Sequence, residues 1–315
     1  MVDFEDIRAA AARIAAHVHR TPVFHSRELD AACGATILMK GEHLQRGGAF
    51  KARGALNAVL SLSDDALAGG VATHSSGNHA AALALAAAVR GVQATVVMPS
   101  NAPAVKQRAV AGYGATIESC EPTLAAREAG LDAVVARTGA AVVHPYNDWK
   151  VIAGQGTAAL ELLDEHPDLE VLLVPVGGGG LLSGTAIAAK AINPALRVVG
   201  VEPVGADDAA RGFRRGERVT GQVPSTIADG LRGELGDKTF SVIRRLVDDI
   251  MTVDDEAIIA AMRFTWERTK QLIEPSSATV IAALLRRDED LRGRRIGVIL
   301  SGGNYDLDDV PWRVK

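Results

Sequence analysis

The chain contains the stretch GGAFKARGA at residues 47–55, in which Lys51 is surrounded mainly by glycine, alanine and phenylalanine. Apolar surroundings remove water from a lysine side chain and disfavour its charged form. A neutral amine is a nucleophile, and its common catalytic use is a Schiff base with a carbonyl compound. The alternative is a lysine at the entry to a helix, predicted over residues 55–62, whose amine extends to water. The stretch alone leaves both interpretations open.

The composition is that of a globular protein of enzyme size. With 315 residues, the chain is long enough for one large or two modest domains. The hydrophobic content of 48% and the charged content of 23% are typical of soluble proteins. A net charge of −4 argues against a nucleic-acid or polybasic membrane-binding role. The longest apolar run, residues 80–89, is too short to span a bilayer.

The N-terminus and the cysteines indicate a cellular compartment. Residues 1–6 contain acids where a signal peptide carries a basic region. Cys33 and Cys120 have neither the spacing of a metal site nor that of a disulfide framework. We therefore expect a cytoplasmic protein with reduced thiols.

Strand and helix patterns alternate along most of the chain. Strands are predicted at residues 36–40, 70–74, 94–98, 116–120, 141–144, 171–176, 197–201 and 295–300. Helices are predicted at residues 3–18, 80–90, 102–112, 123–138, 156–165, 181–191, 254–270 and 276–287. Repeated strand–helix units predict a parallel sheet with helices on both faces. We expect a large domain from residues 1–69 and 141–315, with a small α/β domain at 70–140 inserted in it; residues 202–230 read as irregular.

Four consecutive glycines, residues 177–180, lie between a strand that reads as buried and a helix. Glycines there let backbone N–H groups converge on a phosphate, and the helix N-terminus adds a favourable dipole. Tight packing of strand against helix is the alternative. Leu182 stands where a GxGxxG motif needs its third glycine, and no Gly-Lys-Ser/Thr follows, so nucleotide motifs are absent. A smaller phosphorylated cofactor suits this turn.

Two further polar turns follow predicted strands. The first is SSGNH at residues 75–79, where hydroxyls and N–H groups could hold a carboxylate and Asn78 could hydrogen-bond a phenolic oxygen. A capped helix start is the alternative. The second is SGGN at residues 301–304, after the final strand. Open α/β sheets bind ligands at the carboxyl ends of their strands.

Glu202 and Asp208 lie six residues apart across a turn. Their oxygens, together with a backbone carbonyl, suit Mg²⁺ or Ca²⁺ rather than zinc. By themselves the residues also fit a solvated acidic loop.

With these turns placed, the chain resembles the fold-type II pyridoxal-phosphate (PLP) enzymes, and within them the serine/threonine dehydratase and serine racemase group. The similarity runs from about residue 21 to residue 306. It rests on matching motifs at residues 48–57, 75–79, 144–145, 152–157, 177–180, 226–230, 272–275 and 301–304. The resemblance implies a fold like that of the tryptophan synthase β subunit, with two open, twisted, mainly parallel sheets flanked by helices.

The resemblance also implies roles for individual residues. Lys51 matches the Schiff-base lysine, Phe50 the residue against the pyridine ring, Asn78 the partner of the phenolic oxygen and Ser301 the partner of the ring nitrogen. The implied cofactor-binding set is Phe50, Lys51, Asn78, Gly177, Gly178, Gly179, Gly180, Leu181, Glu274 and Ser301. The implied substrate-binding set is Ser75, Ser76, Gly77, Asn78 and His79. A hydroxyl partner, unlike a carboxylate, does not force protonation of the ring nitrogen. The ring is then a weaker electron sink, and the shorter-lived carbanion favours prompt β-elimination.

Within the group, Ser76 matches the serine that acts as an acid and base opposite the lysine in serine racemases. Glu202, Ala206 (through its carbonyl) and Asp208 match the divalent-metal site of racemases, which would hold Mg²⁺ or Ca²⁺, or Mn²⁺. This match replaces the solvated loop with a metal site. The chain stops after the last strand, without the regulatory domain of biosynthetic threonine dehydratases.

The chain departs from the animal serine racemases at three places. Ala49 stands where serine is usual, Tyr146 replaces an asparagine, and Gly233 falls near a substrate-contacting serine. Tyr146 and Gly233 leave room for threonine or 3-hydroxyaspartate as substrate. Arg127 could reach a second carboxylate, although it also reads as a surface residue of a helix.

The sequence therefore predicts a PLP-dependent ammonia-lyase that converts L-serine or L-threonine to a 2-oxo acid and ammonia. The catalytic residues would be Lys51 and Ser76. The alternatives are a serine racemase with side dehydratase activity and a 3-hydroxyaspartate dehydratase. A homodimer is expected from the resemblance, and neither nucleic acid nor membrane is expected as a partner.

Overall fold

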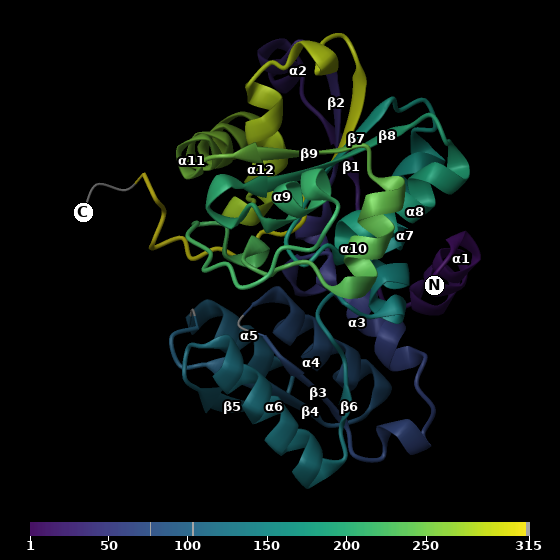
Figure 1. The fold of residues 1–315 in the computed structure, drawn as a ribbon, viewed down its shortest axis with the longest axis vertical. Coiled ribbons are helices and arrows are strands. Elements are labelled where there is room, and N and C mark those ends of the chain that lie inside the picture. Colours follow the sequence, from purple (N-terminus) through teal and green to yellow (C-terminus); the bar gives the residue numbers. More distant parts are fainter. Residues whose placement is uncertain (76, 103, 313–315) are drawn as a thin grey trace.

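The computed structural model describes residues 1–75, 77–102 and 104–312, and it contains two mainly parallel sheets with flanking helices (Figure 1). The larger sheet consists of β1 (Val23–His25), β2 (Thr36–Lys40), β7 (Val171–Pro175), β8 (Arg197–Pro203), β9 (Asp249–Val253) and β10 (Arg295–Ile299). Its strand order is β1-β2-β10-β7-β8-β9. Only the β1–β2 pair is antiparallel. The predicted fold class is confirmed.

The smaller sheet occupies the lower half of Figure 1. Its strands are β3 (Val71–His74), β4 (Ala94–Pro99), β5 (Thr116–Cys120) and β6 (Ala141–Val142), in the order β5-β4-β3-β6. All its neighbouring strands are parallel. One continuous segment supplies the four strands, which agrees with an inserted unit; the domain boundaries stay a prediction.

Helices connect nearly all the strands of both sheets. Their bounds are α1 (Phe4–Ile14), α2 (Arg27–Cys33), α3 (Lys51–Leu60), α4 (Asn78–Arg90), α5 (Ala104–Gly112), α6 (Leu124–Thr138), α7 (Trp149–Glu165), α8 (Gly180–Ile192), α9 (Asp208–Arg215), α10 (Asp237–Leu246), α11 (Asp255–Phe264) and α12 (Pro275–Leu285). None of these described helices is both long and apolar enough to cross a bilayer.

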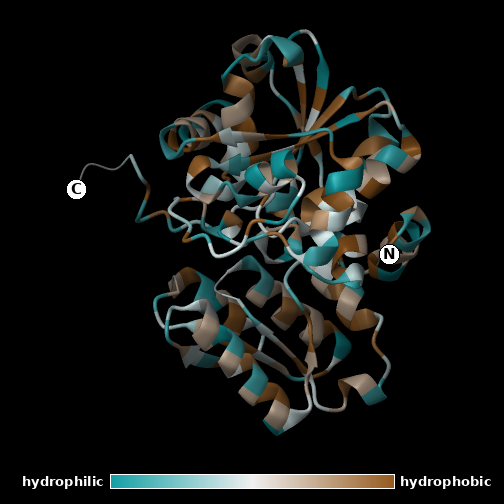
Figure 2. Cartoon of the chain, in the orientation of Figure 1, coloured by the Kyte–Doolittle hydropathy of each residue, from teal (hydrophilic) through white to brown (hydrophobic). Residues whose placement is uncertain are grey.

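The larger sheet is buried on both faces, as strand β7 shows. Val171 and Leu173 pack with α2, α11 and α12 on one face, whereas Leu172 and Val174 pack with α7, α8 and α10 on the other. Successive side chains of a strand point to opposite faces, so a strand covered on both sides must be apolar throughout. The hydrophobic colour along the central strands in Figure 2 follows this pattern.

Helix α3, which begins at Lys51, is held tightly between α4 and α7. A Cβ atom on Gly154 of α7 would lie 2.6 Å from the carbonyl oxygen of Arg53, so only glycine allows this approach. The side chains of Arg53 and Glu42 are 0% exposed and pair at 2.8 Å. Arg53 also pairs with Glu161 at 2.7 Å. Removing one partner of a buried pair is costly, so this network fixes the start of α3.

The structure differs from the predicted elements in several regions, and helix α3 begins at Lys51 rather than at residue 55. Helix α7 begins at Trp149 rather than 156, because the Asp148 side chain accepts hydrogen bonds from the backbone N–H groups of residues 150 and 151. The segment 202–230 is not wholly irregular, since it contains α9. The prediction also missed α2, α10, β1 and β9.

Candidate active site

Lys51 lies at the N-terminus of α3 with its amine directed into the protein. Its Nζ donates a hydrogen bond to the carbonyl oxygen of Pro145 at 2.9 Å. Burial lowers the pKa of Lys51 from 10.5 to about 8, although Glu274 opposes this shift. The Phe50 ring centre lies 5.2 Å from the amine. These contacts favour the nucleophilic amine over a side chain that extends to bulk water.

The four glycines form the turn between β7 and α8. Gly179 has a φ of 85°, which favours glycine, and α8 begins at Gly180. A Cβ on Gly178 would lie 2.2 Å from the ring of Tyr146, and one on Gly177 would lie 2.9 Å from the Cα of Leu231. The turn therefore has room for backbone only.

The N–H groups of this turn suit an anion. Within the described residues, the N–H groups of Gly177, Gly178 and Gly179 have no acceptor. They lie at the N-terminus of α8, where the helix dipole favours negative charge. The side chain of Leu181 is buried in the core, so only its backbone N–H is available to a ligand. The turn fits the phosphate of PLP.

Asn78 and Ser301 lie at the carboxyl ends of strands in the two different sheets. Asn78 starts α4, directly after the turn that follows β3, and its Nδ2 donates to Glu274 Oε1 at 2.8 Å. Ser301 follows β10, and its backbone carbonyl accepts from the N–H of Phe50 at 3.0 Å. Ser301 is bonded to the described residues only through its backbone, which leaves its hydroxyl available to a ring nitrogen.

The turn at residues 75–79 is described except for Ser76, which lies outside the described residues. Ser75 Oγ accepts a hydrogen bond from the N–H of Gly77 at 3.3 Å. The imidazole of His79 instead contacts the carbonyl oxygen of Val143 at 3.0 Å. Burial lowers the pKa of His79 to about 3, so the ring is neutral. Because its imidazole is engaged in this way, His79 can bind a substrate carboxylate only through its backbone N–H.

The three predicted metal ligands are buried, and Asp208 lies within electrostatic reach of Glu202. Glu202 lies near the C-terminal end of β8, and its Oε1 accepts a hydrogen bond from the N–H of Ala210 at 2.6 Å. Asp208 begins α9, and its Oδ2 accepts from the N–H of Leu235 at 3.1 Å. Burial raises the pKa of Glu202 to about 9, with a smaller contribution from the charge of Asp208, and raises that of Asp208 to about 6, with a smaller contribution from Glu234. Ala206 is buried between them in sequence.

This donor set fits a hard cation through two carboxylates and one carbonyl. No group of three or more histidine, cysteine or acidic side chains that could hold a metal occurs in the described part of the chain. A divalent cation would take the place of the protons that burial favours on these acids, with water completing its shell.

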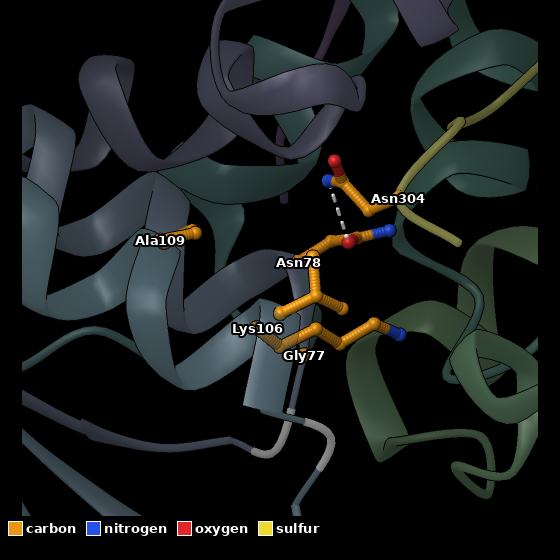
Figure 3. Close-up of a pocket in the computed structure, with 7 residues that line it drawn as sticks. Gly77, Asn78, Lys106, Ala109 and Asn304 are labelled. Carbon is orange, nitrogen blue, oxygen red and sulfur yellow. Dashed lines mark hydrogen bonds between the residues drawn. The ribbon is translucent and has the colours of Figure 1, made fainter. Parts of the chain in front are cut away.

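A group that the sequence did not single out adjoins the turn at residues 75–79. Lys106 of α5 is 6% exposed and forms an ion pair with Asp229. The two residues come from segments that carry different sheets. Figure 3 shows Lys106 beside Gly77 and Asn78, with Asn304 hydrogen-bonded to Asn78; these residues line a cavity together with Ala109. A lysine in an ordinary amphipathic helix carries no sequence signal for such a position.

The comparisons with known proteins identify the family. The family model described as "Pyridoxal-phosphate dependent enzyme" matches residues 14–302. The chain belongs to this family. Its resemblance to the fold-type II enzymes is thereby confirmed, and so is the use of PLP.

Individual relatives cover nearly the whole chain. Serine racemase from Oryza sativa subsp. indica is 49% identical over 98% of the chain and 93% of the relative. A beta-hydroxyaspartate dehydratase from Paracoccus denitrificans is 46% identical over 98% of each protein. The solved structure of maize serine racemase has a TM-score of 0.95, with 48% identity over 98% of this chain and 95% of that one. The relatives of this PLP enzyme are thus ammonia-lyases and racemases.

Proposed function

We propose that the protein is a PLP-dependent dehydratase that converts a 3-hydroxy amino acid, L-serine or L-threonine in the first instance, to a 2-oxo acid and ammonia. The observation that supports this most is the inward amine of Lys51, 2.9 Å from the Pro145 carbonyl and with a pKa lowered to about 8. When bound, PLP supplies an aldehyde for that amine and an electron sink for the substrate.

Different residues of the chain would bind the cofactor, bind the substrate and transfer the proton. Lys51 removes the proton from Cα, because an amine with a pKa near the working pH is an effective base. The N–H groups of residues 75–79 hold the substrate carboxylate. The glycine turn holds the phosphate, and Phe50 and Ser301 orient the ring. A hydroxyl partner at the ring nitrogen favours elimination over transamination.

A second candidate substrate is 3-hydroxyaspartate, and Arg127 favours it. Arg127 is half-buried in the first turn of α6, and no acidic side chain pairs with it in the described residues. Its charge helps to lower the pKa of His74 and opposes the rise in that of Tyr146. Arg127 Nε donates to the carbonyl oxygen of Thr123 at 3.4 Å, and its charge lies within electrostatic reach of Tyr146. A second substrate carboxylate could pair with it there.

Racemisation is a further possible outcome, for which the support is the sequence match of Ser76 and the serine racemases among the relatives. Ser76 would exchange a proton on the face opposite Lys51. A Ser76→Ala substitution would abolish racemisation but leave β-elimination from the L-substrate.

We further propose that Glu202, the Ala206 carbonyl and Asp208 hold Mg²⁺, Ca²⁺ or Mn²⁺, with the burial of both carboxyl groups as support. A homodimeric, cytoplasmic enzyme completes the proposal. Its support is the family resemblance together with the free thiols of Cys33 and Cys120.

One substrate panel tests the proposal. Purified holoenzyme would be incubated with the stereoisomers of serine, threonine and 3-hydroxyaspartate, with ammonia, 2-oxo acid and product chirality all measured. We expect stoichiometric ammonia and 2-oxo acid from a 3-hydroxy amino acid. Preferential turnover of 3-hydroxyaspartate that falls at least tenfold in Arg127→Met would assign the second carboxylate to Arg127. Formation of D-serine faster than pyruvate would instead show a racemase.

A further inference from the structure

A chain of hydrogen bonds runs from the Lys51 motif to Asn78. The backbone carbonyl of Gly47 can only accept a hydrogen bond, and Asn304 Nδ2 donates to it at 2.7 Å. This contact fixes which end of the Asn304 amide carries nitrogen. The same nitrogen also donates to Asn78 Oδ1 at 3.0 Å, the contact drawn in Figure 3. The orientation of the Asn78 amide therefore depends on a backbone carbonyl.

The other end of the Asn78 amide faces a carboxylate. Asn78 Nδ2 donates one hydrogen to Glu274 Oε1 at 2.8 Å. Its second hydrogen has no acceptor among the described residues, so it is available to a bound ligand. Glu274 is 2% exposed, and its Oε2 has no hydrogen-bond partner in the described part of the chain. The bond from Asn78 is strong only while Glu274 is ionised.

The positive charge of Lys106 acts on the carboxyl group of Glu274. Burial raises the pKa of Glu274 to about 7, and the attraction of Lys106 opposes this rise. Three other charged groups act on this cluster. Asp229 raises the pKa of Glu274, and Arg232 opposes the rise in the pKa of Lys106. Lys51 of α3 interacts electrostatically with Glu274, which raises the pKa of Lys51. A Cβ on Gly77 would lie 3.6 Å from Lys106 Nζ, so the ammonium group adjoins the turn that precedes Asn78. Asp229 anchors this amine from the other side.

We propose that Lys106 is a positioning residue for cofactor binding: anchored on Asp229, it keeps Glu274 anionic, so that Glu274 and Asn304 hold the Asn78 amide with an N–H toward the phenolic oxygen of PLP. If Glu274 were neutral, its hydroxyl could donate to Asn78. The amide could then turn its carbonyl toward an oxygen that carries negative charge. The inference rests on the proposed function only through the role of Asn78 in binding PLP.

The test is the affinity of the full-length apoprotein for PLP as a function of pH, followed by cofactor absorbance without substrate. In the wild type we expect affinity to fall as Glu274 becomes protonated near pH 7. Lys106→Met should move this fall upward by about one pH unit and weaken binding about tenfold at pH 7.5. Lys106→Arg keeps the charge and should stay within about twofold of the wild type. Lys190→Met, which breaks the Lys190–Asp248 pair far from Asn78 in sequence, serves as the matched control and should change neither value.

Two further variants separate positioning from a merely structural role. Asp229→Asn keeps an oxygen that can accept from Lys106 and removes a negative charge that raises the pKa of Glu274, so the fall should move to lower pH, opposite to the effect of Lys106→Met. In a Glu274→Gln background, Lys106→Met should cause no further pH shift, because glutamine does not titrate. An unchanged pH profile in Lys106→Met, or an upward shift in Asp229→Asn, would overturn the proposal. If the pH-dependent binding behaves as expected and no 3-hydroxy amino acid is consumed, only the proposed reaction fails.

Discussion

The amine of Lys51 donates a hydrogen bond to the carbonyl oxygen of Pro145 at 2.9 Å, across 94 residues of sequence. The turn that carries Pro145 is itself fixed, since His144 Nδ1 accepts from the N–H of Asn147 at 2.9 Å. Burial lowers the pKa of His144 to about 4, so its ring stays neutral and able to accept. The carbonyl thus holds the lysine in place without adding a charge beside it.

The lowered pKa of Lys51 predicts how the apoprotein responds to alkali. Between pH 8 and 10.5, the folded state binds fewer protons at Lys51 than the unfolded state, so stability rises with pH. Below pH 8 both states are protonated and this slope vanishes. Relative to Lys51→Met, the wild type should gain roughly 3 kcal/mol across the window, from the shift of 10.5 to about 8. Urea unfolding of both proteins over this range measures the difference, and parallel curves would show that the amine is not desolvated.

The buried pair between Arg53 and Glu42 predicts a large loss of stability in Arg53→Met. The substitution leaves the Glu42 carboxylate buried beside no guanidinium group, so we expect a loss of about 3–5 kcal/mol. Arg20→Met is the matched control, because Arg20 pairs with Glu165 at 3.0 Å on the surface. It should cost less than about 1 kcal/mol. Similar losses for the two variants in urea unfolding would mean that the buried network does not hold α3.

The glycine turn predicts a selective loss of cofactor binding in Gly178→Ala. The added methyl group would lie 2.2 Å from the Tyr146 ring, so the turn or the ring must move. Displacement of the N–H groups should weaken PLP binding by the apoprotein at least tenfold, which corresponds to about 1.4 kcal/mol of binding free energy. Gly112→Ala places its methyl group in open space and should bind PLP normally. Unchanged affinity of Gly178→Ala for PLP would mean that the phosphate does not bind at the glycine turn.

The carboxylates Glu202 and Asp208 predict stabilisation by divalent cations. After chelation, addition of Mg²⁺ or Ca²⁺ at a hundredfold excess over Kd should stabilise the protein by about 2.7 kcal/mol. Glu202→Gln should abolish the response in thermal unfolding, whereas Asp168→Asn, in a surface pair with Arg295, should retain it. An identical response in both variants would place the cation at another site.

The parts of the site that the sequence predicted are those that local signals define. Residues 177–180 and 301–304 follow β7 and β10, which are parallel neighbours in the larger sheet, so the two turns lie at the same edge. Asn78 follows β3 of the smaller sheet, so its place beside Glu274 is a tertiary contact that its motif does not define. The motif around Lys51 named the lysine but not its partner, because Pro145 lies far away in the chain.

The parts that the sequence did not predict depend on tertiary contacts. Lys106 meets Asp229 across 123 residues, and nothing in its helix distinguishes it from a surface lysine. The imidazole of His79 turns away to Val143, although its position in the motif suggested a ligand contact. Helix α9 was missed because its sequence, rich in charge and glycine, resembles a loop until Ala209 and Ala210 are seen to be buried.

The central claim is that Lys51 carries the cofactor, and peptide mapping tests it most directly. Holoenzyme would be treated with borohydride to make the attachment permanent, digested, and analysed by mass spectrometry. We expect the pyridoxyl group on the peptide that contains Lys51, and no modified peptide from Lys51→Ala. The same label on Lys40, Lys106 or another lysine of the wild type would contradict the account.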